Sequence, residues 1–331
     1  MNKIAKFPLI ENQYPWMTKR PYNAYKDFLR SRFGGRLQKV CVDAGFTCPN
    51  RDGVKGFGGC TYCNNISFVP PYCKPGMTIA EQVSDGIEYL KRRYKAQQFV
   101  AYFQAYSNTY APLPYLQNLY EQALSHPDIK GLVIGTRPDC IDEEKIAYLA
   151  ELAKSKYISI EYGLESPHDR TLKTLNRAHT FQEWVDAVEM TANRGIHICA
   201  HLILGLPGET REQMLRTAEI ISRYPINSLK IHHLHIVEKT ALATKYLRKP
   251  FPVFEYDEYV EFVAEFLQYL RPDIMIQRLA GETNPRHLIA PRWDVRANIV
   301  QQDIEDEMQK QNVWQGKRYL LSENFEKRAI V

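Results

Sequence analysis

The sequence predicts an α/β protein in which six short strands alternate with helices. After residue 38, short β-branched apolar runs alternate with longer segments whose apolar residues recur at helical spacing. The chain has 331 residues, of which 44% are hydrophobic and 24% are charged. This composition supplies a large core and excludes the disordered and collagen-like classes. Periodicity alone allows either an open doubly wound sheet or a barrel.

The strands and helices can be placed in chain order. The predicted strands are residues 38–43, 98–103, 130–135, 157–162, 196–204 and 227–234. The predicted helices are residues 78–94, 113–125, 142–154, 168–175, 180–194, 210–223 and 255–270. Thr78 with Glu81, and Thr180 with Glu183, have the spacing of a capping box, which marks the start of two of these helices. Residues 235–254 contain two prolines near their end and predict a linker, after which a smaller helical extension follows.

The chain has the features of a cytoplasmic protein. No apolar run approaches the roughly 18 residues needed to span a bilayer, so no membrane segment is expected. The N-terminal segment lacks the apolar stretch of a secretory signal. In a reducing compartment the seven cysteines are expected to serve metal binding or catalysis more than disulfides.

Positive charge gathers near the N-terminus. The formal net charge is +5, and residues 19–39 hold seven basic side chains against the single acid Asp27, with tyrosines and phenylalanines between them. One interpretation is an amphipathic helix whose charged face is solvated. The other is a docking surface for RNA, because basic segments with interleaved aromatics are a weak signature of nucleic-acid binding.

Four of the cysteines lie in one unusually long loop. Residues 44–77 separate the first predicted strand from the first helix, whereas such loops usually have about 2–6 residues. Cys60 and Cys63 form a C-x2-C pair in a glycine-rich stretch, and Cys48 precedes them by an eleven-residue spacer. The loop is therefore expected to carry function.

Three kinds of site fit these cysteines. A structural zinc site would take Cys73 as its fourth ligand, although the spacing is irregular for zinc ribbons. A thioredoxin-type redox pair should open a helix just after a strand, and this pair sits deep in a loop. The third possibility is an iron–sulfur cubane held by three thiolates, which leaves one iron open to a substrate or cofactor.

The loop resembles the radical S-adenosylmethionine superfamily. That superfamily has C-x3-C-x2-C after its first barrel strand, with an aromatic residue before the last cysteine, as Tyr62 is here. The wide first gap is similar to the branch that contains the catalytic subunit of Elongator, and GFTCPNRDG…GGCTYCN resembles an uncharacterised bacterial family within that branch. The likeness covers about residues 30–290. Further matching motifs begin at Gly135, Glu161, Leu175 and His201.

The resemblance implies both a fold and a chemistry. The fold would be a partial (β/α)6 TIM-like barrel, with a basic N-terminal extension at 1–37, a core at 38–235 and a C-terminal helical extension at 236–331. Cys48, Cys60 and Cys63 would hold a 4Fe–4S cluster, and S-adenosylmethionine would chelate its open iron. Reduction by an external donor of the flavodoxin or ferredoxin type would then yield a 5′-deoxyadenosyl radical.

The resemblance also suggests residues that bind the cosubstrate, while no catalytic residue is assigned. The suggested set is Tyr62, Glu161, Arg177, His201 and Gly205. Glu161 would meet a ribose hydroxyl or, alternatively, form a structural ion pair. Arg177 would bind the methionine carboxylate or lie on the surface. Gly205 would let the backbone approach adenine or simply form a βα turn.

The expected substrate is RNA, specifically the side chain of a transfer RNA wobble uridine. This expectation depends on the Elongator likeness, the basic segment 19–39 and an aromatic-basic stretch near the C-terminus. That stretch contains Arg278, Arg286, Arg292, Trp293 and Arg296. The alternatives are a radical enzyme acting on a small metabolite or peptide, and a zinc-stabilised RNA-binding module without catalysis.

Overall fold

The computed structural model describes residues 14–64 and 70–319 and contains a seven-stranded parallel sheet. Its strand order is β1-β2-β3-β4-β5-β6-β8. The strands are β1 (Leu37–Val42), β2 (Gln98–Phe103), β3 (Ile129–Thr136), β4 (Tyr157–Glu165), β5 (His197–Leu204), β6 (Ser228–His233) and β8 (Met275–Arg278). Since this order follows the sequence without a reversal, the doubly wound alternative is excluded.

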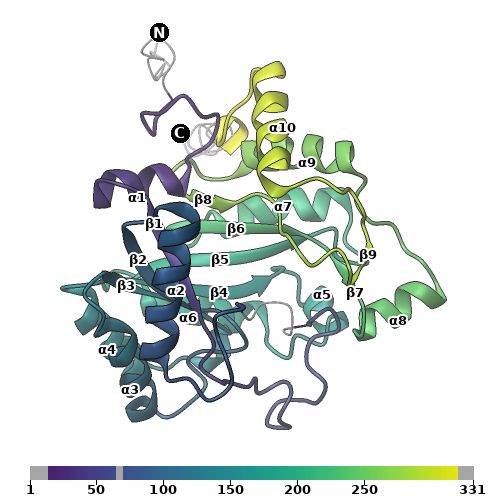
Figure 1. Cartoon of the computed structure of the whole chain (residues 1–331). Helices are drawn as coiled ribbons and strands as arrows, with labels where there is room; N and C mark the ends of the chain where they lie inside the picture. The colour runs from purple at the N-terminus through teal and green to yellow at the C-terminus, as the bar shows by residue number, and fades with distance from the viewer. Residues whose placement is uncertain (1–13, 65–69, 320–331) are drawn as a thin grey trace, which may run out of the picture.

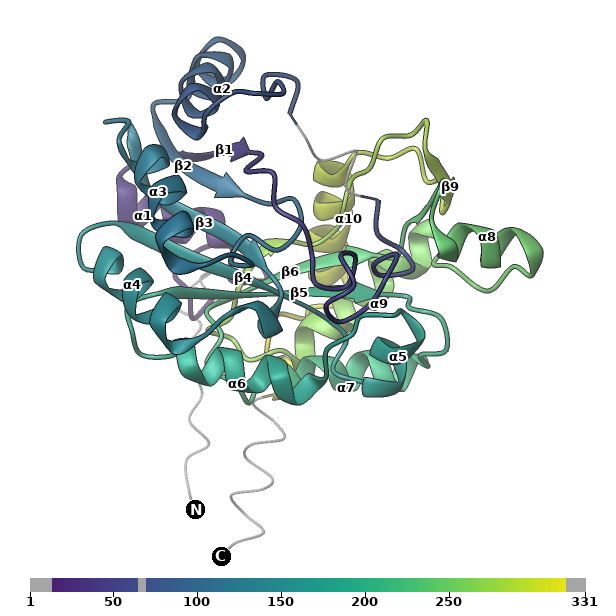
Figure 2. The ribbon, with the colours of Figure 1, turned by 90° about the horizontal axis from the view of Figure 1, so that it is seen from below.

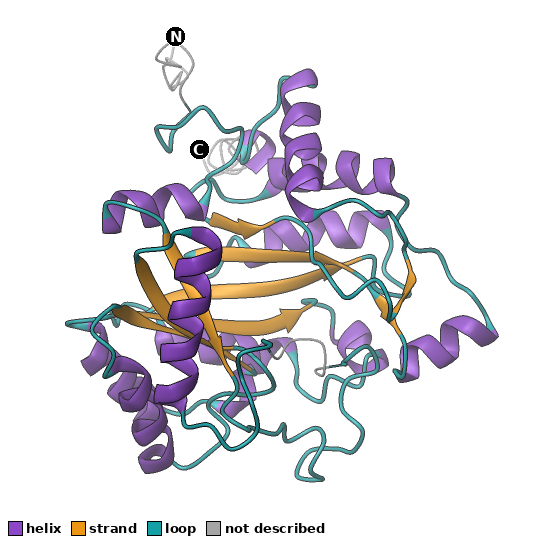
Figure 3. Ribbon diagram, in the orientation of Figure 1, coloured by secondary structure: helices purple, strands orange, loops and turns teal. Residues whose placement is uncertain are grey.

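The sheet curls into a partial barrel with helices along its outer side (Figures 1 and 3). The helices after the first strand include α2 (Ile79–Tyr94), α3 (Leu113–Leu124), α4 (Glu143–Ala153), α5 (Asp169–Thr174), α6 (Phe181–Thr191), α7 (Arg211–Ile221) and α9 (Tyr256–Tyr269). The main core lies between these helices and the sheet, where Phe103, Trp184 and Phe262 are fully buried. The predicted capping boxes at Thr78 and Thr180 are both present. The predicted α/β fold with a partial TIM-like barrel is confirmed.

The prediction of a linker at residues 235–254 was wrong. The segment contains β7 (Ile236–Val237) and α8 (Ala241–Arg248), a helix capped by the Thr240 side chain, which accepts a hydrogen bond from the backbone N–H of Ala243. The later part of the chain is not purely helical either. It supplies β8, which pairs with β6, and β9 (Leu288–Ala290), which pairs with β7, before α10 (Ala297–Lys310).

Helix α1 (Tyr25–Phe33) closes the end of the barrel where the strands begin. The hydroxyl of Tyr25 lies 2.6 Å from that of Tyr157, and the ring of Phe28 stacks on His197 with a centroid distance of 5.8 Å. Tyr157 and His197 are the first residues of β4 and β5. Figure 2 shows α1 and the loop after β1 at opposite ends of the strands.

This position favours the amphipathic-helix interpretation of the basic segment 19–39 over that of a docking surface for RNA. Several of its charges are used inside the protein: Arg20 pairs with Glu305, Arg32 lies over the ring of Tyr157, and Lys39 reaches the barrel interior. An RNA held by α1 would lie at the opposite end of the strands from the cysteine loop. The amphipathic-helix interpretation fits instead.

Within the residues that the structure describes, no helix is both long enough and apolar enough to cross a membrane.

Candidate active site

A cavity of about 270 Å³ opens at the carboxyl ends of the strands. Cys48, Cys60 and Cys63 all line it, so the fold brings the three predicted ligands to one place. Cys48 and Cys60 are each only 8% exposed. The other predicted site residues that line this cavity are Tyr62, Glu161, Arg177 and His201.

Tight local hydrogen bonds shape the cysteine loop. The backbone N–H of Cys63 donates to the carbonyl of Cys60 at 3.0 Å, which makes the C-x2-C pair a single turn. The N–H of Gly59 donates to the carbonyl of Asn50 at 2.8 Å. Gly59 has φ +79°, and a Cβ atom there would lie 2.8 Å from Nε of Arg51. Only glycine fits this position, which explains part of the glycine richness before Cys60.

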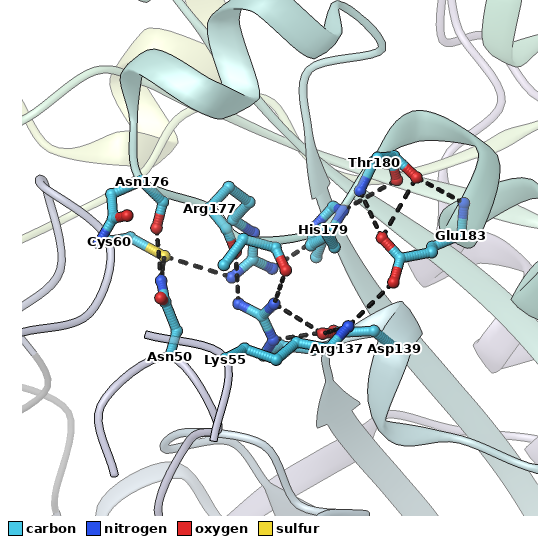
Figure 4. A network of polar contacts seen from close by, with 12 residues as sticks. Asn50, Lys55, Cys60, Arg137, Asp139, Asn176, Arg177, His179, Thr180 and Glu183 are labelled. Carbon is cyan, nitrogen blue, oxygen red and sulfur yellow. Dashed lines mark hydrogen bonds and ion pairs between the residues drawn. The ribbon is translucent and has the colours of Figure 1, made fainter. Parts of the chain in front are cut away.

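Two side chains contact the sulfur of Cys60 (Figure 4). Nη1 of Arg177 lies 3.5 Å from Sγ, and Nδ2 of Asn50 lies 3.7 Å from it. Arg177 also donates to the carbonyl of Gly163 at 2.6 Å. It is 7% exposed, so the surface alternative for Arg177 was wrong.

A chain of polar contacts leads from the backbone carbonyl of Arg177 to the surface (Figure 4). Nη1 of Arg137 donates to the carbonyl of Arg177 at 2.7 Å, and its fork holds both oxygens of Asp139 at 2.8 Å. Lys55 then bridges Asp139 at 2.7 Å and Glu183 at 2.9 Å. Although burial alone would raise the pKa of Asp139, Arg137 and Lys55 lower it. The chain fixes the turn that carries Arg177.

Tyr62 and Glu165 complete the wall beside the cysteines. Burial is the main cause that raises the pKa of Glu165, and it also raises the pKa of Tyr62. The guanidinium of Arg177 lies 3.4 Å from Glu165. Asn50 and Glu165 were not predicted as site residues, and short-range sequence patterns give no signal for either.

Gly205 is the one predicted cosubstrate residue that is not among those lining the cavity. Its φ is +83°, and a Cβ atom would lie 2.9 Å from Cδ2 of Phe254. Close packing in a left-handed turn therefore explains this glycine, as the alternative interpretation of a βα turn required.

Glu161 lies at the centre of an ionic cluster inside the barrel. Its carboxylate lies 2.7 Å from Nζ of Lys39, 2.5 Å from Nζ of Lys230 and 3.1 Å from Nε2 of His201. The hydroxyl of Tyr102 donates to it at 2.7 Å. Burial would raise the pKa of Glu161, but the two lysines hold it well below the usual range. The structural ion pair that the sequence left open is therefore present.

The aromatic-basic stretch near the C-terminus does not form a free stacking platform. Trp293 packs on His233 with a centroid distance of 3.9 Å, and its Nε1 donates to the carbonyl of Phe254 at 3.0 Å. Arg278 points to His232, with 3.1 Å between Nη2 and Nδ1. Only Arg286, Arg292 and Arg296 of that predicted set are exposed.

The other predicted metal arrangements do not fit this geometry. Cys73, the proposed fourth zinc ligand, is not among the cavity residues, and its sulfur lies 3.7 Å from the carbonyl of Cys41. The C-x2-C pair forms a turn within a loop, and the next helix of the described chain, α2, begins at Ile79. Neither the zinc nor the thioredoxin-type arrangement is supported.

The residues around the cysteines fit a 4Fe–4S cluster with a bound cosubstrate. Three thiolates leave one iron open. Among the described residues, Oγ of Ser107 and Nε of Arg177 are buried without a hydrogen-bond partner, and both residues line the cavity. Such polar atoms are costly unless a ligand satisfies them. They suit the amino and carboxylate groups of S-adenosylmethionine.

A three-cysteine site at the carboxyl ends of a partial barrel defines a radical S-adenosylmethionine enzyme. The chain belongs to the radical SAM superfamily, whose family model matches residues 48–221, and a radical SAM C-terminal domain matches residues 226–310. The protein is thus an enzyme that uses a 4Fe–4S cluster and S-adenosylmethionine. The non-catalytic zinc module is excluded.

Two relatives match this chain over nearly its whole length. The uncharacterised protein YtqA of Bacillus subtilis (strain 168) is 34% identical over 307 residues, which cover 92% of this chain and 95% of YtqA. The uncharacterised protein MJ0486 of Methanocaldococcus jannaschii is 33% identical, with 89% of this chain and 91% of that protein covered.

The likeness to the Elongator branch extends to sequence and fold. A tRNA uridine(34) acetyltransferase of Methanocaldococcus infernus is 25% identical over 53% of this chain and 29% of its own length. The structure of Elp3 from the same organism has a TM-score of 0.65 at 16% identity, and the match covers 84% of this chain and 64% of that one.

Proposed function

We propose that this enzyme modifies the side chain of a transfer RNA wobble uridine. The observation that carries the proposal is a basic and aromatic pair at the cavity. Arg51 and Tyr106 both line it, with 5.8 Å between the guanidinium carbon and the ring centroid, and Tyr106 is 36% exposed. Unpaired bases of RNA stack on such side chains.

The backbone at Tyr106 gives further support. Its φ is +64°, in the left-handed region that non-glycine residues seldom adopt. Such conformations cluster at functional sites, because the surrounding structure must hold them. Names of relatives also favour uridine 34 of tRNA, since three of them are tRNA uridine(34) acetyltransferases.

The chain's own residues have defined parts in this function. When bound and reduced by a flavodoxin or ferredoxin type of donor, the cluster and S-adenosylmethionine supply a radical that abstracts hydrogen from an unactivated C–H bond. Cys48, Cys60 and Cys63 would hold the cluster. Arg177, with an unpaired Nε, would meet the methionine carboxylate, and Tyr62 covers this wall of the cavity.

His201 and Glu161 both line the cavity, where they would contact the ribose or the substrate. His201 is the candidate that remains a neutral donor and acceptor, because burial lowers its pKa to about 4. We also propose a cytoplasmic setting, in which a reducing compartment keeps the cysteines available to the cluster.

A second candidate is a radical enzyme that acts on a small metabolite or peptide. The ionic cluster around Glu161 favours it, because polar groups lie deep in the barrel where a small substrate would fit.

The nucleoside profile of bulk tRNA tests the proposal. A strain without the gene should lose one modified wobble uridine and accumulate its precursor, and wild-type protein should restore it whereas the Cys60→Ala variant should not. An unchanged profile would refute the tRNA proposal and favour the small substrate.

Binding of tRNA tests the stacking pair directly. Tyr106→Ala should weaken tRNA binding by about 1–3 kcal/mol, the range for loss of one base–aromatic stack. The matched control is Tyr94→Ala, because Tyr94 is also exposed but lies on α2 outside the cavity. Equal affinities for the two variants would contradict the assignment of Tyr106.

A further inference from the structure

The barrel interior below the cavity holds more positive than negative charge. Lys39 on β1, Lys230 on β6 and Arg278 on β8 all reach this layer, and the acid in contact with the two lysines is Glu161 on β4. Across the described residues, no other carboxylate lies within 4.0 Å of these three cations. Lys39 has 27% of its side chain exposed and is partly solvated, but the side chain of Lys230 is 8% exposed.

Arg278 is the cation without an acidic partner. Its Nη2 donates to Nδ1 of His232, while its Nε is buried and has no hydrogen-bond partner among the described residues. The Glu161 carboxylate is already taken up by two lysines, a tyrosine hydroxyl and a histidine. A guanidinium whose buried Nε has no hydrogen-bond partner is costly unless an anion approaches it.

His232 contacts Arg278 and also lines the cavity. Because Nδ1 accepts from Arg278, the ring proton of the neutral histidine lies on Nε2. The ring of His232 lines the same cavity as Tyr102, Glu161 and His201. Gly281 lets the chain pass close to it, since a Cβ there would lie 2.5 Å from Nδ1. The imidazole is therefore held as a donor on the cavity side of Arg278.

A metal ion does not suit this position. Ligand atoms of Glu161, Cys199 and His201 do lie within 4.8 Å of one another. However, the carboxylate is neutralised by Lys39 and Lys230, and a cation would be repelled by both lysines and by Arg278. The excess of positive charge among these side chains therefore favours binding of an anion over a cation.

We propose that Arg278, Lys230 and His232 form a subsite for an anionic group of the substrate, either a carboxylate or a phosphate. The guanidinium fork matches the two oxygens of either group. Of the three residues His232 lines the cavity, while Arg278 contacts His232 and Lys230 contacts Glu161, which also lines it. A group bound there would anchor a substrate whose reacting carbon faces the cosubstrate. This inference deepens the proposed function, because it states what chemistry the substrate carries.

Binding of small anions to the reconstituted holoenzyme tests the subsite without turnover. Unfolding temperatures are measured anaerobically against sodium phosphate and sodium acetate, with sodium chloride keeping the ionic strength constant. Saturating S-adenosylmethionine fills the separate carboxylate site at Arg177. Phosphate or acetate should raise the unfolding temperature. The anion that binds more tightly shows whether the substrate's anionic group is a phosphate or a carboxylate.

Variants of Arg278 and of a control arginine test whether the anion binds at the proposed subsite. Arg278→Gln should weaken anion binding at least about tenfold, the effect of losing a charged hydrogen bond. Arg278→Lys, which keeps the charge without the fork, should give an intermediate loss and guards against misfolding of the first variant. Arg286→Gln removes an exposed arginine from the same stretch and should bind as the wild type does.

The results separate this inference from the proposed function. If neither anion binds, or if Arg278→Gln binds as tightly as Arg286→Gln, the subsite is refuted whatever the tRNA profile shows. If anions bind as expected but the tRNA profile of the deletion strain is unchanged, the subsite stands and the substrate is a small anionic molecule.

Discussion

Replacing Glu161 by glutamine should destabilise the protein strongly, because it leaves two lysines in the barrel without their shared partner. Removing one member of a buried ion pair typically costs about 3–5 kcal/mol. Lys230 has 8% of its side chain exposed and bears most of this cost, whereas the 27% exposure of Lys39 reduces its share. We therefore expect a loss of about 3 kcal/mol, or a decrease in unfolding temperature of roughly 4 °C for a chain of 331 residues.

The pH dependence of this loss has a definite sign. Burial lowers the pKa of Lys230 to about 8, and Glu161 works against that decrease. In Glu161→Gln the pKa of Lys230 falls further, so the amine is neutral at a lower pH. An unfolded lysine titrates near pH 10.4, so the unfolded state binds more protons between the two pKa values and stability rises with pH there. The difference in the free energy of unfolding between Glu161→Gln and the wild type should therefore become smaller from pH 7 to pH 9.

Thermal unfolding under anaerobic conditions measures both effects. The double variant Glu161→Gln with Lys230→Met should recover much of the loss, because it removes the stranded charge as well. The reasoning fails if Glu161→Gln unfolds at the wild-type temperature, or if the double variant is less stable than the single one.

Three further outcomes follow from the site. Cys60→Ala should abolish bound iron in a colorimetric assay while Cys199→Ala, whose thiol is buried in β5, should retain it; iron that survives loss of Cys60 would show that the ligand set is wrong. Arg177→Met should keep the cluster but bind S-adenosylmethionine at least about tenfold more weakly in equilibrium dialysis, and unchanged binding would remove its assigned role. Gly205→Ala should lower the unfolding temperature more than Gly208→Ala, because both have positive φ but only the first meets Phe254; equal losses would mean that backbone strain alone requires glycine there.

The sheet could be predicted from the sequence wherever a strand is long and buried. The predicted segments 98–103 and 157–162 coincide with or fall within β2 and β4, because continuous apolar runs bounded by turns specify buried parallel strands. β8 was missed because it has four residues, of which only Ile276 is buried. β7 and α8 were missed because the two prolines after α8 suggested a linker for the whole segment.

The sequence was enough to predict that Cys48, Cys60 and Cys63 come together at one site, as they do at the cavity, but not which groups surround them. Cysteine spacing is local, whereas Lys55 and Glu183 are 128 residues apart and meet only in the folded chain. Lys39 and Lys230 likewise lie 191 residues apart on β1 and β6, and only the folded sheet brings both to Glu161. Trp293 was assigned to RNA from composition alone, and its packing on His233 shows why composition cannot distinguish a buried ring from a free one.

Incubation of the anaerobically purified protein with S-adenosylmethionine and dithionite tests the central claim most directly. A radical S-adenosylmethionine enzyme should be brown, with thiolate–iron absorption near about 400 nm, and should slowly release 5′-deoxyadenosine even without substrate. Cys60→Ala should be colourless and release none. A colourless wild-type protein, or S-adenosylhomocysteine as the sole product, would contradict the account.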